Sequence, residues 1–447
     1  MTTVFERLDS LPLTKFHLIA AVACAAGLGA DLMEISIGSA LSAVFSTAPY
    51  HMNSQHLSWL LSAVFAGAVI GAPLLGWLAD RRGLKPILVA ALVWLCLTSL
   101  LAAGSANTTW LVVMRFLSGL SLGALPPLII AYLTGIAPPR YRGVFIFWAC
   151  SFGFLWAPAA IFAIRWLTPI HPLGIEGWRW PFAAAGLLSL GASAVLAYLP
   201  ESPRWLLAAG KEGAAERACR QFESSRAVWG TKAPVLRPGM ETSKRRPSLE
   251  HPMAKPMMSV KRRVAFIAVI YFLQPWDSLG FNLLTGPFLL QRGYSLSNTL
   301  LVVGIATFGP SISTFIAGLY IDRIERATAL VLCGALALAA AATFFMLPIP
   351  LWTMAAVVVY GVAQGLYVPL MTTYGSEILP TKVRASATSG AWGMNRIGSV
   401  LVPLSVIPAF HQGGPGAAAA LIYIPLVVSI VLVLLVGPRG ITGKGVA

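Results

Sequence analysis

The sequence predicts an all-α membrane protein with twelve transmembrane helices in two pseudo-symmetric bundles of six. Of its 447 residues, 57% are hydrophobic and only 11% are charged, whereas a soluble globular domain has about 25% charged residues. A helix needs about 20 apolar residues to cross a hydrocarbon core about 30 Å thick, because each residue rises about 1.5 Å. Apolar blocks of that length recur at 17–46, 57–79, 85–104, 109–135, 143–166, 180–199, 262–290, 298–321, 328–347, 350–376, 385–408 and 417–437.

The distribution of positive charge predicts the orientation of these helices. With both termini in the cytoplasm, all but five of the 32 Lys and Arg residues fall in cytoplasmic segments. Arg165, Arg179 and Arg292 lie on the outer side, and Arg115 and Arg396 lie within spans. This asymmetry is the positive-inside rule, so the net charge of +16 reflects topology and contact with anionic lipid. We therefore expect a multi-pass protein of the inner or plasma membrane and no nucleic-acid partner.

No pattern in the sequence indicates an enzyme, a cofactor or a metal site. The five cysteines are scattered without the spacing of a metal cluster, and there is no nucleophile–base set or phosphate-binding loop. We expect a monomer whose partners are the lipid bilayer, a small solute and H⁺.

Proline residues are expected to break or kink several of the helices, because proline lacks the N–H that the helix needs. These residues are Pro126, Pro127, Pro158, Pro275, Pro287, Pro369 and Pro403.

A polar, basic segment at 201–261 divides the predicted spans into 1–200 and 262–447. Its early part, 211–222, is expected to form a surface helix, and the remainder reads as a flexible linker. Charged motifs recur at matching positions on the two sides of it. Gly-x-x-x-Asp-Arg occurs at 76–81 and again at 318–323, six spans later. Such internal similarity is typical of transporters built from repeats.

These motifs resemble those of the major facilitator superfamily. Residues 76–86 are similar to its loop motif G-x-L-a-D-R-x-G-R-K, with Leu84 where Arg is usual. Residues 200–206 (PESPRWL) and the pattern Tyr374-x-x-Glu-x-x-Pro-Thr-x-x-Arg resemble its sugar and organic-solute porters. Within that branch, residues 11–17 and Asp31-x-x-Glu34 are similar to aromatic-acid:proton symporters and bacterial niacin-type carriers. The resemblance implies the major facilitator fold and transport by alternating access.

The resemblance also implies a cytoplasmic gate of ion pairs that holds one state and breaks in the other. Asp80 would face the start of span eleven, where the helix dipole favours a carboxylate. The other members would be Gly76, Arg81, Gly83, Lys85, Arg142, Glu201, Arg204, Asp322, Arg323, Glu377 and Arg384. The alternative is that these are solvated loop charges that only help to set the topology.

Five ionisable residues lie within spans: Asp31, Glu34, Arg115, Asp277 and Arg396. A charge at mid-membrane costs at least about 2.5–3.5 kcal/mol, so such residues usually line a working cavity. Three carboxyl groups face two guanidinium groups, which stay protonated. Burial and a neighbouring like charge favour a neutral carboxyl, so we expect Asp31 or Glu34 to carry the coupling proton and to pair with Arg115. The alternative is that these residues form fixed structural pairs.

Arg396 is the predicted substrate anchor, because its planar fork suits a carboxylate and small residues surround it. Other predicted pocket residues at similar depth are Asp277, Tyr271, Gln274, Asn282, Gln364, Tyr367 and Trp148. Aromatic rings there would favour an aromatic substrate by stacking, although such rings in helices often serve only packing.

The sequence thus predicts a proton-coupled importer of a small organic anion, such as an aromatic or pyridine carboxylate. A sugar or polyol carrier is the nearest alternative. Sugar porters have a Gln-Gln pair five residues before an Asn in span seven, whereas Gln274 and Asn282 stand eight apart without a pair. A nutrient sensor that does not transport is a further alternative.

Overall fold

The computed structural model describes residues 4–138, 141–229, 259–320, 325–347, 349–379 and 381–438, which are almost entirely helical. Its elements are α1 (Val4–Asp9), β1 (Leu13–Thr14), α2 (Lys15–Val44), α3 (Ser54–Arg82), α4 (Leu84–Ala103), α5 (Thr108–Leu122), α6 (Leu125–Ile136), α7 (Arg142–Phe154), α8 (Trp156–Leu167), α9 (Arg179–Tyr198), α10 (Pro203–Ala208), α11 (Glu212–Ser224), β2 (Ala227–Trp229), α12 (Val260–Gln291), α13 (Leu296–Ala306), α14 (Gly309–Tyr320), α15 (Arg326–Met346), α16 (Pro350–Ile378) and α17 (Thr381–Leu435).

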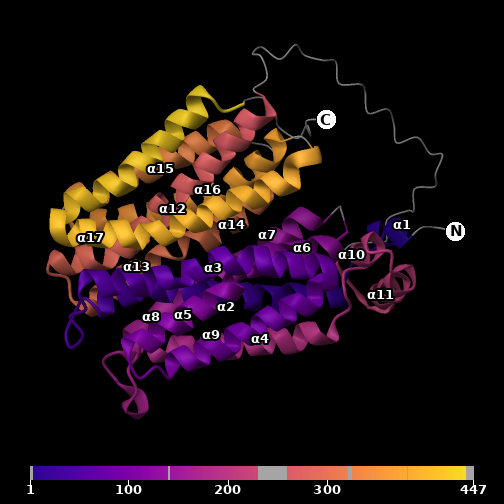
Figure 1. The fold of residues 1–447 in the computed structure, drawn as a ribbon, viewed down its shortest axis with the longest axis horizontal. Helices are drawn as coiled ribbons and strands as arrows, with labels where there is room; N and C mark the ends of the chain where they lie inside the picture. Colours follow the sequence, from indigo (N-terminus) through magenta and orange to yellow (C-terminus); the bar gives the residue numbers. More distant parts are fainter. Residues whose placement is uncertain are drawn as a thin grey trace.

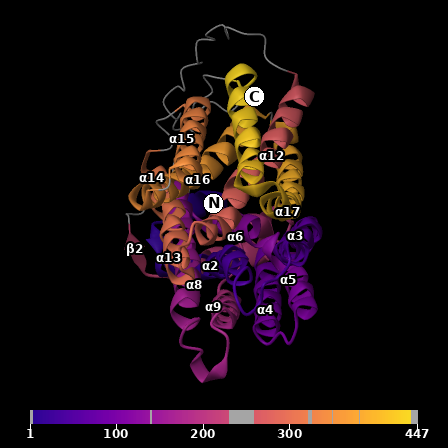
Figure 2. The ribbon, with the colours of Figure 1, turned by 90° about the vertical axis from the view of Figure 1, so that its left-hand side faces the viewer.

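The long helices form two bundles that lie side by side (Figures 1 and 2). Helices α2 to α9 make up the N-terminal half, and α12 to α17 make up the C-terminal half. One end of the molecule carries α1, α10 and α11, and we call it the linker end; the opposite end is the loop end. The domain boundaries at 200 and 262 stay a prediction.

The predicted twelve crossings are confirmed, and the last two of them both belong to α17. Eleven helices in the described part of the chain are long and apolar enough to span a bilayer. The last one belongs to α17, which has 55 residues and, at about 1.5 Å per residue, far exceeds a bilayer of about 30 Å. Gly414 breaks it with φ 75° and ψ −179°, a conformation open to glycine. α17 therefore crosses twice, turning back at the loop end (Figure 1).

Prolines break some spans and leave others continuous. Breaks separate α5 from α6 just before Pro126, α7 from α8 just before Pro158, and α13 from α14 just before Pro310. The last of these was not predicted. By contrast, Pro275, Pro287, Pro369 and Pro403 lie inside continuous helices, so the chain is not broken there. Packing against neighbouring helices can hold a helix together across a proline.

Matching glycine contacts join corresponding helices in the two halves. A Cβ at Gly119 of α5 would lie 2.0 Å from the Val64 carbonyl oxygen of α3. A Cβ at Gly361 of α16 would lie 2.3 Å from the Ala306 carbonyl oxygen of α13. Only glycine permits so close a backbone approach. Spans two and four therefore pack as spans eight and ten do. Gly119 and Gly361 can be taken as equivalent positions in the two halves.

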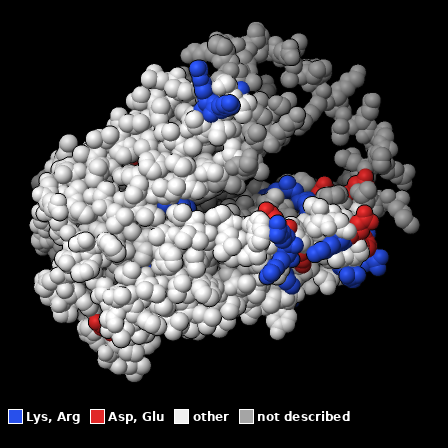
Figure 3. Space-filling view, viewed as in Figure 1, with Lys and Arg blue, Asp and Glu red and all other residues white. Residues whose placement is uncertain are grey.

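The N-terminal segment docks onto the start of the linker. Arg7 of α1 forms ion pairs of 2.8 Å with Glu216 and 2.5 Å with Glu223, both on α11. β1 pairs with β2 in an antiparallel manner. The surface helix predicted at 211–222 is confirmed as α11, and residues 230–258 of the linker lie outside the described residues. Figure 3 shows the charged side chains gathered at this end, whereas most of the remaining visible surface is uncharged.

Candidate functional site

Three carboxyl groups are buried near the middle of the membrane-spanning helices. Asp31 and Glu34 lie on α2, and Asp277 lies on the corresponding first helix of the C-terminal half, α12. Their exposed fractions are 1%, 0% and 2%. Each needs a partner at this depth, because an uncompensated charge there is costly.

Glu34 is fully engaged within the N-terminal half. Its Oε2 lies 2.8 Å from Nη1 of Arg115 on α5, which also donates to the Glu34 carbonyl oxygen at 2.8 Å. The Ser99 hydroxyl on α4 donates to Oε1. The side chains of Arg115 and Glu34 are 1% and 0% exposed. This arrangement is a sealed ion pair, and Ser99 is a member that the sequence reasoning missed.

Asp31 is placed differently, although it is on the same helix face. Both of its carboxylate oxygens are buried without a hydrogen-bond partner among the described residues, which is uncommon in native structures. Arg396 of α17 lies close enough for electrostatic attraction across the two halves, but it forms no direct ion pair with Asp31. Arg396 is half-buried, and its guanidinium carbon lies 5.7 Å from the Trp392 ring centroid.

Polar and aromatic groups from α12 and α17 meet beside Arg396. Asn395 Nδ2 donates to Gln274 Oε1 at 2.8 Å and to the Tyr271 carbonyl oxygen at 3.1 Å. Tyr271 and Trp392 pack edge to face with centroids 5.6 Å apart. The structure thus brings the predicted residues Tyr271 and Gln274 to the neighbourhood of Arg396. Asn395 and Trp392 were missed, although they stand one and four positions before Arg396.

Asp277 forms a third group with α16, and no described guanidinium is bonded to it. The Tyr360 hydroxyl contacts Asp277 Oδ1 and lies 2.8 Å from its backbone carbonyl oxygen. Gln364 Nε2 donates to Oδ2. Tyr360 was missed, although it precedes the predicted Gln364 by one helical turn. We call Asp277, Tyr360 and Gln364 the Asp277 cluster.

The other predicted pocket residues lie elsewhere. Tyr367 is buried and hydrogen-bonds to Ser429. Asn282 donates to the Ser278 carbonyl oxygen of its own helix at 2.8 Å. Trp148 of α7 stacks on Phe315 of α14, with centroids 5.8 Å apart. These three positions therefore read as helix packing in this conformation.

At the linker end, the predicted gate residues of the N-terminal half contact one another within that half. Glu201 accepts hydrogen bonds from the Lys85 backbone N–H at 3.0 Å and from the Ser202 N–H at 2.8 Å. Lys85 Nζ donates to the carbonyl oxygens of Ala197 and Leu199. Gly83 has φ 122°, and a Cβ there would lie 2.5 Å from Glu201 Oε2. Burial raises the pKa of Glu201 above its ordinary value.

Arg204 anchors the start of α10 to the N-terminal bundle at the linker end. It donates to the Thr134 and Ala137 carbonyl oxygens at 2.7 and 3.0 Å and pairs with Asp9 at 2.6 Å. Asp9 was not predicted, since it lies 195 positions away. Arg142 is half-buried and close enough to both for electrostatic interaction.

The remaining gate residues form no contact between the halves within the described residues. Gly76 has open space around it, Asp80 is exposed, and Arg81 lies over the Trp77 ring at 4.0 Å. Asp322 and Arg323 lie outside the described residues, as do the side chains of Glu377 and Arg384.

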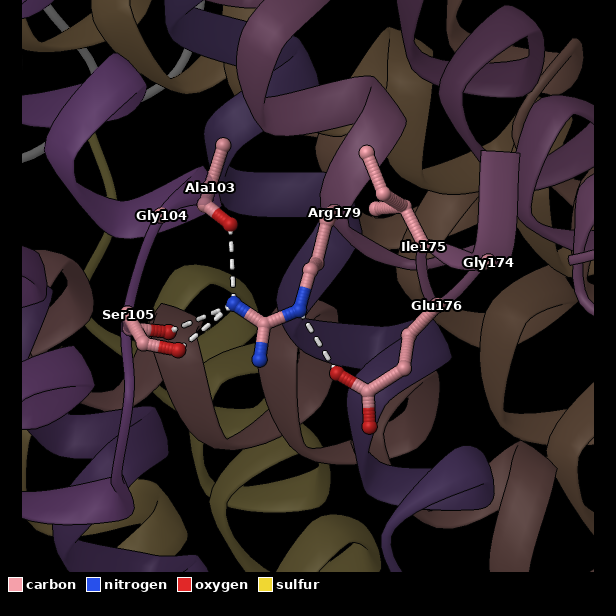
Figure 4. A pocket seen from close by; sticks show the side chains of 7 residues that line it. All are labelled: Ala103, Gly104, Ser105, Gly174, Ile175, Glu176 and Arg179. Carbon is pink, nitrogen blue, oxygen red and sulfur yellow. Dashed lines mark hydrogen bonds and ion pairs between the residues drawn. The ribbon is translucent and has the colours of Figure 1, made fainter. Parts of the chain in front are cut away.

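A pocket of about 440 Å³ lies at the loop end, between the α4–α5 and α8–α9 connections (Figure 4). Arg179 spans it, donating to Glu176 at 2.6 Å, to the Ala103 carbonyl oxygen at 2.8 Å and to the Ser105 carbonyl oxygen at 2.6 Å. Tyr50 also donates to Glu176. These contacts hold the loops at this end together, so we do not place the solute site there.

Comparison with known proteins decides the family. The sequence profile of the Major Facilitator Superfamily matches residues 20–403. The chain belongs to this superfamily. It is 26% identical over 433 residues to the arabinose-proton symporter of Bacillus subtilis (strain 168), covering 89% of this chain and 88% of that protein. It is 24% identical over 420 residues to the niacin transporter NiaP of Acinetobacter baylyi, covering 91% and 92%.

Solved structures of the same fold include the inward open conformation of the xylose transporter XylE from E. coli, with a TM-score of 0.72 and 18% identity over 96% of this chain and 97% of that chain. The protein is therefore a major facilitator transporter in the membrane, not an enzyme.

In this major facilitator chain the two halves meet closely toward the loop end. Ser42 of α2 donates to the Leu283 carbonyl oxygen of α12 at 3.0 Å. A Cβ at Gly286 would lie 2.9 Å from the Ala43 Cβ, and Arg165 donates to the Ser297 carbonyl oxygen at 2.9 Å. Together with the exposed Asp80 at the other end, these contacts describe a carrier closed toward the loop end.

Proposed function

We propose that this transporter imports a small organic anion together with a proton, with Arg396 holding the carboxylate of the solute and Asp31 taking the proton. The observation that carries the proposal is the state of Asp31. It is a buried carboxyl that has no hydrogen-bond partner in the part of the chain that the structure describes, and it faces Arg396 from the opposite half.

The balance of charges in the site couples the binding of the solute to the uptake of a proton. Glu34 and Arg115 neutralise each other in a sealed pair, so they offer no net charge to the solute. Asp31 and Arg396 balance each other when the site is empty. A carboxylate that binds Arg396, for which a bidentate fork is suited, leaves Asp31 as a surplus negative charge. Uptake of one proton by Asp31 restores neutrality in a low-dielectric site.

The residues beside Arg396 support a planar, partly polar solute. Tyr271 and Trp392 offer aromatic faces, and Gln274 and Asn395 offer hydrogen-bonding groups nearby. Aromatic contacts of this kind favour flat rings. The likeness to a niacin transporter supports an aromatic or pyridine carboxylate. With the linker end in the cytoplasm, as the positive-inside rule indicates, the proton gradient would drive inward movement.

Symport of a neutral sugar with a proton is the second candidate, and the likeness to an arabinose-proton symporter favours it. The two candidates differ in net charge moved. A monoanion with one proton is electroneutral, whereas a sugar with one proton moves one positive charge. The membrane potential is worth about 2.3 kcal/mol per charge per 100 mV, and a pH difference of one unit about 1.4 kcal/mol per proton.

The decisive experiment is uptake into vesicles that contain the purified chain, with the pH difference and the potential imposed separately. Labelled nicotinate, benzoate and arabinose are the probes. We expect accumulation of an acid that follows the pH difference and does not respond to the potential. Accumulation of arabinose that responds to both would replace the anion proposal by the sugar candidate.

Variants of the two proposed residues test their roles in the same vesicles. Asp31→Asn should abolish accumulation against a gradient while leaving solute exchange intact. Arg396→Lys should weaken uptake of acids more than that of neutral solutes. Glu176→Gln at the loop end serves as the control acid, with no expected change. Full accumulation by Asp31→Asn would remove Asp31 from proton coupling.

A further inference from the structure

The Asp277 cluster holds a buried acid that is bonded to no cation within the described ranges. Asp277, Tyr360 and Gln364 are 2%, 1% and 7% exposed. Oδ1 contacts the Tyr360 hydroxyl and Oδ2 accepts from Gln364, so both partners are neutral. An ionised carboxylate at this depth would stand uncompensated.

The charged and titratable groups on the helices packed against α12 leave Asp277 without an ion pair. α2 carries Lys15, His17, Cys24, Asp31 and Glu34, and the side chains described on α17 include Arg396 and His411. None of them is bonded to Asp277. On α16, Tyr360 contacts it directly and Tyr367 interacts with it only electrostatically. Tyr423 interacts with Tyr360 from the second crossing of α17. All three of these groups are phenols, which are neutral at physiological pH.

A count of hydrogens in the cluster indicates the protonation state. The Tyr360 hydroxyl has one hydrogen, yet it lies within hydrogen-bond distance of two acceptors on Asp277, the backbone carbonyl oxygen at 2.8 Å and Oδ1. A hydroxyl has one donor hydrogen and two acceptor lone pairs. If it donates to the carbonyl oxygen, the contact with Oδ1 lacks a hydrogen unless Asp277 supplies one.

We propose that Asp277 carries a resident proton on Oδ1 in this conformation and donates it to the Tyr360 hydroxyl oxygen. Tyr360 then donates to the Asp277 carbonyl oxygen, and Gln364 Nε2 donates to Oδ2. Every close contact in the cluster has one hydrogen. The cluster is a neutral unit that joins α12 to α16, the first and fourth spans of the C-terminal half.

A neutral Asp277 changes the charge balance inferred from the sequence. Three carboxyl groups and two guanidinium groups suggested that the surplus proton belongs to Asp31 or Glu34. With Asp277 neutral, the empty carrier is already balanced, since Glu34 faces Arg115 and Asp31 faces Arg396. The resident proton of Asp277 is therefore separate from the proton proposed to move with the solute, and Asp277 is a positioning residue rather than a solute ligand.

Infrared spectroscopy of the purified full chain tests this assignment without any solute. A protonated carboxyl has a C=O stretching band that is separate from that of a carboxylate. We expect such a band at neutral pH in the wild type, shifted by exchange into D₂O, and its loss in Asp277→Asn. Glu34→Gln is the matched control, because the ion-paired Glu34 contributes no such band. A spectrum of Asp277→Asn with the wild-type band intact would overturn the assignment.

Two further measurements guard against a folding defect in that variant. Tyr360→Phe keeps Asp277 but removes the acceptor of its proton, so the band should remain and move to higher frequency; an unmoved band would contradict the assignment. Asp277→Asn should also keep the pH-driven accumulation of the wild type within about twofold, since Asn is neutral and nearly isosteric. A loss of pH coupling in Asp277→Asn would show that its proton moves during transport.

Discussion

Each half of this transporter buries an acid near the middle of its first long helix, and the two acids have different partners. Gly119 and Gly361 make equivalent helix contacts, so the residue four positions earlier can be compared in each half. In the N-terminal half it is Arg115, which pairs with Glu34. In the C-terminal half it is Val357, which is apolar and buried. The residue at this one position thus decides whether the buried acid has a cation as its partner.

The C-terminal half compensates with neutral groups. Tyr360 and Gln364 lie about one and two helical turns after Val357 on α16, and both contact Asp277. A carboxylate paired with a guanidinium remains charged, whereas burial of a carboxyl without a cation favours its protonated form. The comparison teaches that the groups around a buried acid set its charge. The predictions below test this difference.

The largest effect is expected from breaking the ion pair of the N-terminal half. Arg115→Leu leaves Glu34 buried and charged, and removal of one partner of a buried pair costs about 3–5 kcal/mol. Unfolding of the purified chain in detergent measures the loss. The double variant Arg115→Leu with Glu34→Gln should recover much of it, because no charge remains unpaired. A single variant as stable as the wild type would mean that Glu34 is protonated or hydrated.

A smaller loss is expected in the C-terminal half. Tyr360→Phe removes the hydroxyl that contacts Asp277 and leaves buried polar atoms unsatisfied, which costs about 1–3 kcal/mol. Tyr423→Phe is a matched control, because the Tyr423 hydroxyl has no hydrogen-bond partner among the described residues. Unfolding of the two variants under the same conditions compares them. Equal losses would show that the Asp277 cluster contributes nothing beyond ordinary packing.

Part of this comparison could be predicted from the sequence, because hydropathy and charge are local properties. The spans follow from apolar blocks, and any ionisable residue within them stands out. The choice between Asp31 and Glu34 as partner of Arg115 could not be predicted, since residues three apart share a helix face. Tyr360 was hidden because tyrosine is common in helices, and only its contact with Asp277 distinguishes it. The ion pair of Arg7 and Glu216 joins segments 209 positions apart.

Glu201 extends the comparison to an acid outside the membrane, where the smallest effect is expected. It is half-buried and bonded to the backbone N–H groups of Lys85 and Ser202 rather than to a cation. Burial raises the pKa of Glu201 above its ordinary value, so the folded chain binds this proton more tightly than the unfolded chain. The free energy of unfolding should then fall as the pH rises from the ordinary pKa of a glutamate through the raised pKa.

Glu201→Gln removes the titration, so its stability should be flatter than that of the wild type over this pH window. Unfolding midpoints of the two proteins across mildly acidic to neutral pH measure the difference. Glu216→Gln is a useful contrast, because hydrogen bonds from Arg7 and Arg220 lower the pKa of Glu216, and its loss should remove stability gained as the pH rises. The difference in unfolding free energy between wild type and variant should therefore change with pH in opposite directions for the two variants. The reason is that the pKa of Glu201 is raised and that of Glu216 is lowered. Parallel pH profiles would mean that the contacts of Glu201 with backbone N–H groups offset its burial.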